Sequence, residues 1–524
     1  MARPPARPAV IAGLVAFVVF GAITILWSWS VPLMSSPDEP HHVVKAVAVW
    51  RGEWLGRHTP GANSATMTMY VPRTYARALG NFDCYRQRAY IPAGCAPKIV
   101  ASTQIWPAKT HVGRYPPLYY LLIGWPSRLS VAVDSMRWMR AISALIDSVV
   151  IAVGIFVIRR HRLGAGLLAG YCCALTPVAI YMDSTIQPNG FEATLGLLVA
   201  TCVIALATLV KRGTLDPPRH LFVITGVASS LLVLVRGLSP LWLACIGVVA
   251  LLLIPWKLWM SWFRRRDVQV LMAVLLVCSG LAIAWIIGAD ALAIQPWPKS
   301  LMVYTHVSDW REVQLVLDRE GWFAEQMVGA LTKETRLPVP AFAAAFFAFS
   351  LVVIAGFVSG KGRERAALAW AVLGSFLIPV ALAAPRIREN GINWQGRYTM
   401  PFAFTILLLG ASMAFGSTER LSRRARMLTA SLTAGSFALV GVSYWAMLRR
   451  YSVSNNGPLD LFTIHHPSWS PAVLSIPVFA AVVPAVLLVA ALFFVALLPR
   501  CQLEPRLAQD SAAALRPVPA PASI

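Results

Sequence analysis

The stretch that decides the fold class is the apolar run AVIAGLVAFVVFGAITILWSW (residues 9–29), which is soon followed by Ser-Ser-Pro-Asp-Glu-Pro-His-His (35–42). A run of about 20 apolar residues is long enough to cross a bilayer as a helix. Asp38 and Glu39 therefore follow the point where a membrane helix would emerge into water, where a charged pair is costly unless it serves a purpose. Pro37 and Pro40 flank the pair and prevent the helix from continuing. The stretch predicts an acidic group held at a membrane surface for chemistry.

The composition agrees with a membrane protein. Of the 524 residues, 57% are hydrophobic and only 13% are charged, whereas a soluble chain carries about 25% charged residues. Repeated apolar runs predict an all-α polytopic membrane protein, because a helix satisfies its own backbone hydrogen bonds inside lipid. The net charge of +23 is spread over short clusters between these runs. That pattern indicates membrane topology and argues against a nucleic-acid partner.

The basic clusters predict which helix ends face the cytoplasm, since cytoplasmic loops are enriched in Lys and Arg and an even number of spans must separate neighbouring clusters. The apolar run 116–132 breaks this parity, and it is shorter than the others and interrupted by Pro126 and Arg128. We predict that it is a re-entrant or surface-lying helix, which leaves about 12 spans with both termini in the cytoplasm. The predicted spans are 9–30, 137–159, 164–182, 190–210, 221–236, 240–256, 270–290, 339–358, 366–384, 399–416, 428–447 and 472–498. The clusters are Arg159-Arg160-His161-Arg162, Lys211-Arg212, Arg264 to Arg266, Lys361 to Arg365 and Arg420 to Arg426, with Arg3, Arg7 and Arg500 near the termini.

We therefore predict one transmembrane domain over residues 1–498 and a short disordered cytoplasmic tail over 499–524, which is rich in Pro and Ala. The segments with unusual chemistry all fall outside the cytoplasm, namely 31–136, 183–189, 236–240, 291–338, 385–398 and 448–471. The first of them contains His41 to Trp54, whose apolar spacing predicts an amphipathic helix lying on the membrane. It also contains Cys84 and Cys95, which would form a disulfide on the oxidising side of the membrane.

Several arginines lie on this outer side, where short loops are normally poor in arginine. The loop 385–398 carries Arg386, Arg388 and Arg397. Arginine binds phosphate with two parallel hydrogen bonds, and Gly396 would let a ligand approach the backbone. Arg114 and Arg236 lie at the edges of two other outer segments. All five are predicted to bind the phosphate of an anionic ligand.

Polar and aromatic residues on the same side are candidates for contacts with a sugar. Asp183, Gln187 and Asn189, with Glu192 one turn later, would place polar groups at the membrane rim. The segment 291–338 carries tryptophans suited to sugar stacking, Trp297, Trp310 and Trp322 among them, without a single outstanding residue. The predicted substrate-binding residues are His41, His42, Tyr115, Asp183, Gln187, Asn189, Trp394 and Gln395.

This inventory matches glycosyl transfer from a lipid-phosphate sugar. One of Asp38 and Glu39 would deprotonate an acceptor hydroxyl, with the other as its support. Arginines would stabilise the departing phosphate, and the helices would hold a polyprenyl chain. The chain contains no glycine-rich nucleotide motif, in keeping with a lipid-borne donor.

Four motifs, in this order, resemble the DUF2142 family of bacterial membrane proteins: Pro-Asp-Glu-Pro-His-His (37–42), Tyr-Pro-Pro-Leu-Tyr-Tyr (115–120), Gln-Pro-Asn-Gly (187–190) and Trp-Gln-Gly-Arg-Tyr (394–398). The resemblance covers roughly residues 10–415. That family is similar to the GT-C superfamily of polyprenyl-phosphate-dependent glycosyltransferases, which includes protein mannosyltransferases and the aminoarabinose transferase of lipid A.

The resemblance implies a GT-C-like helical bundle with juxtamembrane helices outside the cytoplasm. It implies an acidic residue in the first extracytoplasmic loop, which maps onto Asp38 or Glu39, and a Pro-Pro-Leu-Tyr-Tyr helix that need not span. Tyr115 stands where relatives often have histidine, so the resemblance gives it no role. The expected location is the bacterial cytoplasmic membrane.

Two other functions remain open at this stage. One is a transporter or flippase of a polyprenyl-linked saccharide, against which the spans count because they are nearly free of charge, with Asp147 and Glu192 as exceptions. The other is a polymerase or ligase that joins lipid-linked glycans. No cofactor is predicted with certainty, and a divalent cation is left open because two adjacent carboxylates are too few ligands to argue for one.

Overall fold

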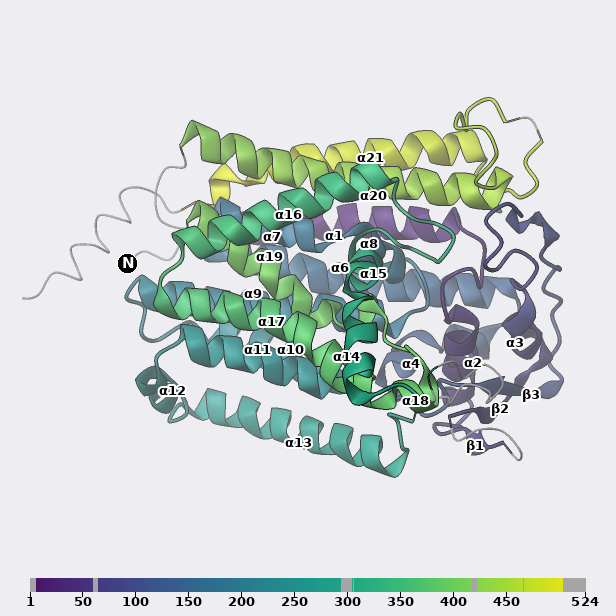
Figure 1. Ribbon diagram of the computed structural model, residues 1–524, viewed down its shortest axis with the longest axis horizontal. Helices are drawn as coiled ribbons and strands as arrows, with labels where there is room; N and C mark the ends of the chain where they lie inside the picture. Colours follow the sequence, from purple (N-terminus) through teal and green to yellow (C-terminus); the bar gives the residue numbers. More distant parts are fainter. Residues whose placement is uncertain are drawn as a thin grey trace, which may run out of the picture.

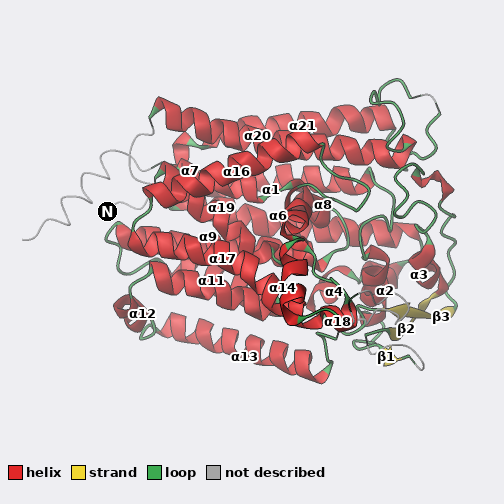
Figure 2. Cartoon of the chain, viewed as in Figure 1, coloured by secondary structure: helices red, strands yellow, loops and turns green. Residues whose placement is uncertain are grey.

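The structure is a computed structural model that describes residues 6–59, 65–293, 304, 306–416, 422–464 and 466–502. Arg3, Trp297, Arg420 and most of the predicted tail lie outside the described residues. Within the described part, the chain is a bundle of long helices that run roughly parallel to one another (Figures 1 and 2).

Eight helices in the described ranges are long and apolar enough to cross a membrane. Their apolar sequences account for this, because a helix in lipid needs about 20 such residues. Helix α1 packs against α6, and α20 lies beside α21. The eight helices are α1 (Ala6–Trp29), α6 (Val133–Arg160), α9 (Pro188–Lys211), α13 (Arg266–Gly288), α16 (Val339–Ser359), α17 (Gly362–Ala383), α20 (Arg423–Val453) and α21 (Ile476–Leu497).

The other predicted spans are helical but are broken or short. Helices α7 (Ala165–Ala174) and α8 (Pro177–Asp183) meet at 65°, and α11 (Ser239–Leu253) and α12 (Trp256–Trp262) at 112°. Pro177 and Pro255 lie at these breaks, where proline cannot continue the hydrogen bonds of the preceding helix. Helices α10 (Arg219–Val233) and α19 (Met400–Phe415) are apolar but shorter. The described residues thus support eight to ten spans by length and composition, and a count of 12 remains a prediction.

The run 116–132 does not form a long helix. It folds into α4 (Leu118–Ile123) and α5 (Pro126–Leu129), each much shorter than a bilayer is thick. The parity argument had predicted that this run does not span.

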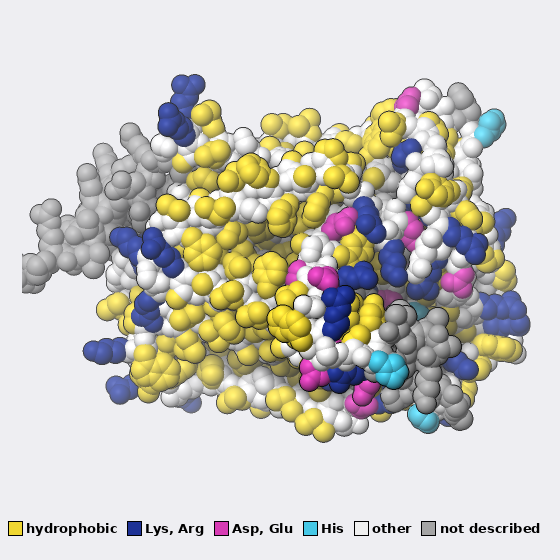
Figure 3. Space-filling view, in the orientation of Figure 1, with side chains coloured by type: hydrophobic (Ala, Val, Ile, Leu, Met, Phe, Trp, Pro, Cys, Tyr) yellow, Lys and Arg dark blue, Asp and Glu magenta, His cyan; other side chains and the backbone are white. Residues whose placement is uncertain are grey.

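The helices alternate in direction, and their described basic ends gather at one end of the bundle. Figure 1 places α12 at that end, and Figure 3 shows Lys and Arg side chains there on the visible face. The opposite end carries α2 (Glu39–Val49), α3 (Arg73–Arg77), α4 and the strands, so the long first loop folds there. Which end faces the cytoplasm stays a prediction from the charge pattern.

The first loop folds into a small α/β cap, which corrects two predictions. Helix α2 (Glu39–Val49) is buried at every residue except His41, so it is not an amphipathic helix on the membrane surface. It packs against α4, the short helices α3 (Arg73–Arg77) and η1 (Ala78–Gly80), and a three-stranded antiparallel sheet. The fold is therefore not entirely α-helical, and the strands are β1 (Arg57–His58), β2 (Met67–Pro72) and β3 (Ile105–Thr110).

A buried lysine fastens α2 to the cap. The Lys45 ammonium group donates to the carbonyl oxygens of Trp54 at 2.5 Å and Gly113 at 2.7 Å. Burial lowers the pKa of Lys45 to about 7. The two carbonyl contacts satisfy two of the three donors that burial would otherwise leave unpaired.

The described part of segment 291–338 crosses the bundle. Helices α14 (Asp309–Leu317) and α15 (Glu320–Val328) lie across the direction of the long helices. They contact the turn after α17, formed by η4 (Ala384–Arg386) and α18 (Ile387–Asn390), and the short helix η5 (Gly396–Tyr398). The loop 385–398, which carries Arg386, Arg388 and Arg397, is thus held between α15 and the bundle.

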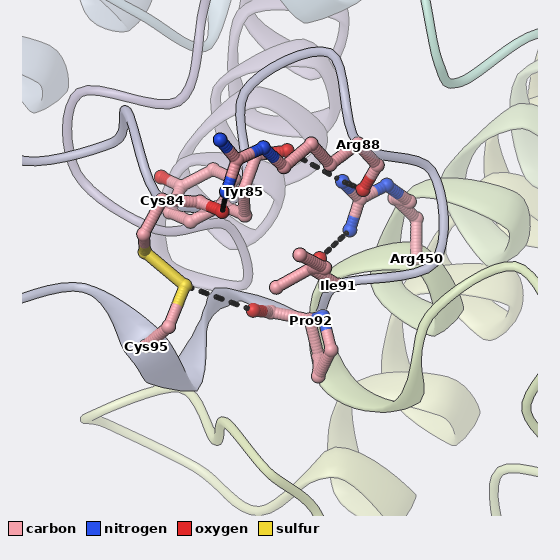
Figure 4. The surroundings of a disulfide bond; sticks show 7 residues. All are labelled: Cys84, Tyr85, Arg88, Ile91, Pro92, Cys95 and Arg450. Atoms are coloured by element: carbon pink, nitrogen blue, oxygen red, sulfur yellow. Dashed lines mark hydrogen bonds between the residues drawn. A yellow bond between two sulfur atoms is a disulfide. The ribbon is translucent and has the colours of Figure 1, made fainter.

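Cys84 and Cys95 form a disulfide that closes a loop of the cap. Arg450, at the end of α20, donates to the carbonyl oxygens of Tyr85 at 2.9 Å, Arg88 at 2.7 Å and Ile91 at 2.6 Å (Figure 4). One arginine therefore ties this loop to the last part of the bundle.

Replacing both cysteines with serine is expected to lower the melting temperature of the purified protein. A disulfide that closes a loop of this length (sequence separation 11) limits the unfolded chain and typically contributes about 2–4 kcal/mol. Thermal unfolding in detergent measures the effect. The control is Cys278→Ser, which removes a free thiol and should leave the melting temperature nearly unchanged.

Candidate active site

Asp38 lies at the N-terminus of α2 and is ion-paired across the molecule. Its backbone is left-handed, with φ of 63°, which directs the side chain away from the helix that follows. One carboxylate oxygen lies 2.5 Å from the Arg397 guanidinium, 359 residues later in the chain. The other lies 3.6 Å from Nε2 of His111. The Asp38 side chain is 27% exposed, so a bound molecule can reach it.

The charges around Asp38 keep it ionised. Burial alone would raise the pKa of this carboxyl group, but the Arg397 guanidinium, with a smaller contribution from His111, holds it well below its usual range. His41 packs on His111 with ring centroids 4.2 Å apart, and burial lowers the pKa of His41 to about 3. Burial likewise lowers the pKa of His42 well below its usual value. His41 and His42 are therefore neutral near pH 7.

Glu39 has a different environment and is locked in place. Its carboxylate accepts two hydrogen bonds from the Arg140 guanidinium, both at 2.6 Å, and both side chains are 1% exposed. Arg140 also donates to the carbonyl oxygens of Ser28, Val31 and Pro32. These contacts tie the loop after α1 to helix α6, so Glu39 has a structural role. It gives Glu39 no access to a substrate.

The two adjacent carboxylates do not converge on one point. Asp38 faces Arg397 and His111, whereas Glu39 faces Arg140. Among the described residues, no three His, Cys, Asp or Glu side chains come together as a metal-ligand set. The donors present here do not fit a divalent cation held by the Asp-Glu pair, because an arginine already neutralises each carboxylate.

Arg236 is buried rather than extended toward lipid headgroups. It pairs with Glu192 at 2.9 Å, and Ser239 donates to the same carboxylate at 2.6 Å. The guanidinium carbon lies 4.9 Å from the ring centre of Tyr398 and 5.6 Å from that of Tyr115. Arg236 thus forms part of a cationic and aromatic wall near Asp38.

The other predicted phosphate ligands separate into two groups. Arg386 lines a cavity next to Asp38, is exposed, and has no ion pair with the described residues. Arg114 instead contacts the end of α13 through the Ala289 carbonyl at 2.9 Å and Asp290 at 3.4 Å. Arg388 pairs with Asp309 and Glu312 of α14. The structure therefore places Arg236 and Arg386 in the lining of one cavity at Asp38 and Arg397 against Asp38 itself, and it leaves Arg114 and Arg388 in structural contacts elsewhere.

Gly396 serves packing, which corrects the prediction that it admits a ligand. A Cβ atom there would lie 1.9 Å from the carbonyl oxygen of Phe323 in α15. The Gly396 amide donates to the Gln326 side chain at 2.7 Å. This close approach fixes the strip before Arg397, so that Trp394 and Gln395 both line the cavities at Asp38.

The polar turn after α8 is buried beneath the site rather than exposed at a rim. Asp183 and Gln187 are fully buried and Asn189 is 3% exposed. Gln187 donates to the Ser36 hydroxyl at 3.4 Å, and the Ile186 amide donates to Glu39 at 3.2 Å. The turn therefore supports the loop that carries Asp38, which leaves these residues out of direct reach of a substrate in the cavities.

Two cavities meet at Asp38. The first, of about 500 Å³, lies between the disulfide loop, α8, α15 and the strip at 392–397. The second, of about 360 Å³, lies between His111, Tyr115, Arg236, Arg386 and the apolar ends of α11 and α17. Asp38, Asn393, Trp394 and Gln395 line both. One carboxylate is thus accessible from two sides.

The family model for DUF2142, described as "Predicted membrane protein (DUF2142)", matches residues 20–406. The chain belongs to the DUF2142 family. The matched part of this DUF2142 protein includes Asp38, Arg140, Arg236 and Arg397 and therefore covers the candidate active site. The chain is a multi-pass membrane protein by this match and by its helices.

Solved structures similar to this DUF2142 protein include two of ArnT from Cupriavidus metallidurans. The one bound to undecaprenyl phosphate is 14% identical with a TM-score of 0.40, over 96% of this chain and 78% of that one. The apo structure is 15% identical with a TM-score of 0.42, over 93% and 76%. No curated protein matches the chain. At this level of likeness, the chemistry of the DUF2142 site must be argued from its own residues.

Sequence reasoning missed several residues that build the site. Arg140, the partner of Glu39, lies within the predicted span 137–159 but was not singled out. His111 and Tyr398 line the second cavity, and the Tyr120 hydroxyl lies 2.8 Å from Nδ1 of His42. Tyr398 and Tyr120 belong to motifs quoted above, so their motif membership was a usable signal. Arg140 also offered a usable signal in the sequence, because an arginine inside a span needs a partner.

Proposed function

We propose that this protein is a membrane glycosyltransferase that moves a sugar from a polyprenyl-phosphate donor to a cell-envelope glycan or glycolipid. The reaction would take place on the extracytoplasmic face of a bacterial cytoplasmic membrane. The observation that carries this proposal is the position of Asp38, which lines two cavities and is paired with a guanidinium. The similarity of the DUF2142 family to the GT-C superfamily supports the same function.

The second cavity suits the lipid-linked donor. Leu238, Leu292 and Leu382 give it an apolar lining, as a polyprenyl chain requires. Arg236 and Arg386 add positive charge at the same cavity, as a phosphate requires. We call it the donor cavity.

The first cavity suits the acceptor. Its lining mixes aromatic rings with amide and charged groups, including Tyr181, Trp322, Gln326 and Gln395. Tryptophan and tyrosine faces with nearby hydrogen-bonding groups fit a sugar. We call it the acceptor cavity.

The proposed step uses the junction between the two cavities. Asp38 takes the proton of an acceptor hydroxyl, and the oxygen attacks the anomeric carbon of the donor sugar. The bond from that carbon to the phosphate oxygen breaks, and the polyprenyl phosphate leaves with the bonding electrons. Arg236, Arg386 and Arg397 offset its negative charge.

Arg397 links donor binding to the basicity of Asp38. In the free protein its guanidinium holds the pKa of Asp38 well below the usual range, against the opposing effect of burial, and such a carboxylate is a weak base. A donor phosphate competes for the same guanidinium. When Arg397 turns to the phosphate, the pKa of Asp38 rises, and the carboxylate becomes a stronger base only once the donor is bound.

This coupling predicts two different acid limbs in the pH profile of transfer. Below its pKa Asp38 carries a proton and accepts no other, so a higher pKa moves the loss of activity to higher pH. We expect the acid limb of kcat, which reports the donor complex, to lie at higher pH than that of kcat/KM. In Arg397→Gln the limb of kcat/KM should also move to higher pH, whereas Arg388→Gln should leave it in place. Coincident limbs in the wild type would contradict the coupling.

The proposal itself is tested with purified protein in detergent and a radiolabelled polyprenyl-phosphate sugar. Envelope glycans and glycolipids extracted from the source bacterium serve as acceptors. Appearance of label in an acceptor supports the proposal. A ligase that joins two lipid-linked glycans would label only a polyprenyl-linked product, so the chemical form of the product separates the two enzymes.

One observation favours translocation as a second candidate. Asp147 and Asp183 are fully buried in the bundle, and three of their four carboxylate oxygens have no hydrogen-bond partner in the described structure. Buried carboxylates in spans often mark proton or ion pathways. If the protein is a flippase, vesicles containing it will move a fluorescent polyprenyl-linked saccharide across the bilayer, and Asp147→Asn with Asp183→Asn will stop that movement.

A further inference from the structure

The acceptor cavity has more positive than negative charge, and this imbalance bears on the acceptor's chemistry. Its described lining includes two acidic residues, Asp38 and Glu334, and five basic ones, Arg86, Arg319, Lys333, Arg397 and Arg450. Figure 3 shows Lys and Arg side chains gathered on the face that α14 and α15 cross.

Two of the five cations are already engaged. Arg397 pairs with Asp38. Arg450 donates to three carbonyl oxygens of the disulfide loop and lies within electrostatic reach of Glu334. Each acidic residue of the lining therefore lies within electrostatic reach of an engaged cation.

The other three cations come from three separate segments. Arg86 belongs to the disulfide loop and packs on the Phe82 ring at 5.0 Å. Arg319 precedes α15, and Lys333 follows it. All three side chains are exposed, line the cavity, and form no ion pair with the described residues. A cleft lined by one sign of charge concentrates ligands of the opposite sign.

The loop that carries Arg86 lines the cavity and is restrained by two kinds of contact. The disulfide closes the loop, and Arg450 donates hydrogen bonds to its backbone carbonyl oxygens (Figure 4). At its tip Gln87 takes a left-handed backbone with φ of 56°, which few residues other than glycine adopt. Arg86 is also close enough to affect His41 electrostatically. This cation therefore stands near the reaction centre as well as in the cavity.

We propose that the acceptor is anionic and carries a phosphate or a carboxylate that Arg86, Arg319 and Lys333 bind. This inference rests on the proposed function, because it assigns the first cavity to the acceptor. The shared chemistry is a negatively charged group on a sugar. Phosphorylated glycans and uronic acid glycans are its two sources.

A direct binding experiment uses the full-length protein in detergent and three soluble probes. Trigalacturonic acid supplies carboxylates, maltotriose 6-phosphate supplies a phosphate, and maltotriose is the neutral reference. We expect one or both anionic probes to bind on the order of tenfold more tightly than maltotriose at low salt, with a smaller difference at high salt. The tighter anionic probe identifies the source of the charge.

The matched variants decide whether the three cations are responsible. In the triple variant Arg86→Gln, Arg319→Gln, Lys333→Gln, the preference for the anionic probe should disappear. The control Arg77→Gln, Lys98→Gln, Arg311→Gln removes the same charge from exposed positions that line neither cavity, and it should keep the preference. Equal binding of charged and neutral probes to the wild type, or equal loss in both triple variants, would overturn the inference.

Donor hydrolysis in the same preparations separates this inference from the proposed function. If the wild type cleaves the polyprenyl-phosphate sugar but does not prefer anionic probes, the anionic acceptor is wrong and the enzyme stands. If anionic probes bind tightly but no donor is cleaved or transferred under any condition, the assignment of this cavity to an acceptor is overturned together with the enzyme.

Discussion

Asp38→Asn is expected to reduce the kcat of sugar transfer by about 10²–10⁴, the range that a positioned general base contributes. Asparagine has nearly the same shape but accepts no proton. Because Asp38 also competes for Arg397, the variant should bind the polyprenyl-phosphate donor at least as tightly as the wild type. The measurement is kcat from initial rates at saturating donor, together with donor affinity from direct binding.

One control variant makes this result specific. Asp83→Asn removes an exposed carboxylate of the cap that lines neither cavity, and its kcat should be unchanged. Full transfer by Asp38→Asn would refute the role of this carboxylate. A loss of donor affinity with an intact kcat would instead make Asp38 part of the binding site only.

Arg140→Met is expected to cost about 3–5 kcal/mol of stability, since it leaves the Glu39 carboxylate buried without its partner. Both side chains are 1% exposed, and their two hydrogen bonds are 2.6 Å long. The double variant Glu39→Gln, Arg140→Met removes both charges and should recover part of the loss. Denaturant unfolding of the detergent-solubilised protein measures the three free energies.

Arg137→Met provides the control on the same helix. Arg137 is 35% exposed and pairs with the exposed Asp134, and surface pairs of this kind contribute about 0–1 kcal/mol. If Arg140→Met were no more destabilising than Arg137→Met, Glu39 would not be a structural residue. It would then return as a candidate for the base.

The membrane fold was accessible from sequence because apolar length and charge parity are local patterns. Residues 9–29 and the other long runs predict helices, and the interruption at Pro126 and Arg128 led to the correct prediction that 116–132 is not a long helix. The cap was not accessible. Strands β2 and β3 are separated by more than 30 residues, and their pairing depends on a long-range register that no local pattern specifies.

The site could be predicted in part for a similar reason. Asp38 and Arg397 stand out because each is a charged residue where membrane topology does not require one. Which member of the acidic pair is structural and which lines the cavities was not predictable, because it depends on which arginine faces which carboxylate. Glu39 turns to Arg140, 101 residues away, and Asp38 turns to Arg397. Arg388 looked equivalent to Arg397 in sequence, yet it faces the acidic α14.

The 359 residues between Asp38 and Arg397 also set a time during biosynthesis. At the usual rate of about 5–20 residues per second, a ribosome needs roughly 20–70 seconds to add that stretch. Throughout this interval Asp38 has been made but its guanidinium partner has not. The hydrogen bonds from Arg450 to the disulfide loop form later still, since Arg450 follows Tyr85 by 365 residues. Under the proposed function, a nascent chain would therefore have neither a complete donor cavity nor a fixed wall of the acceptor cavity, so an unfinished copy would not consume lipid-linked sugar.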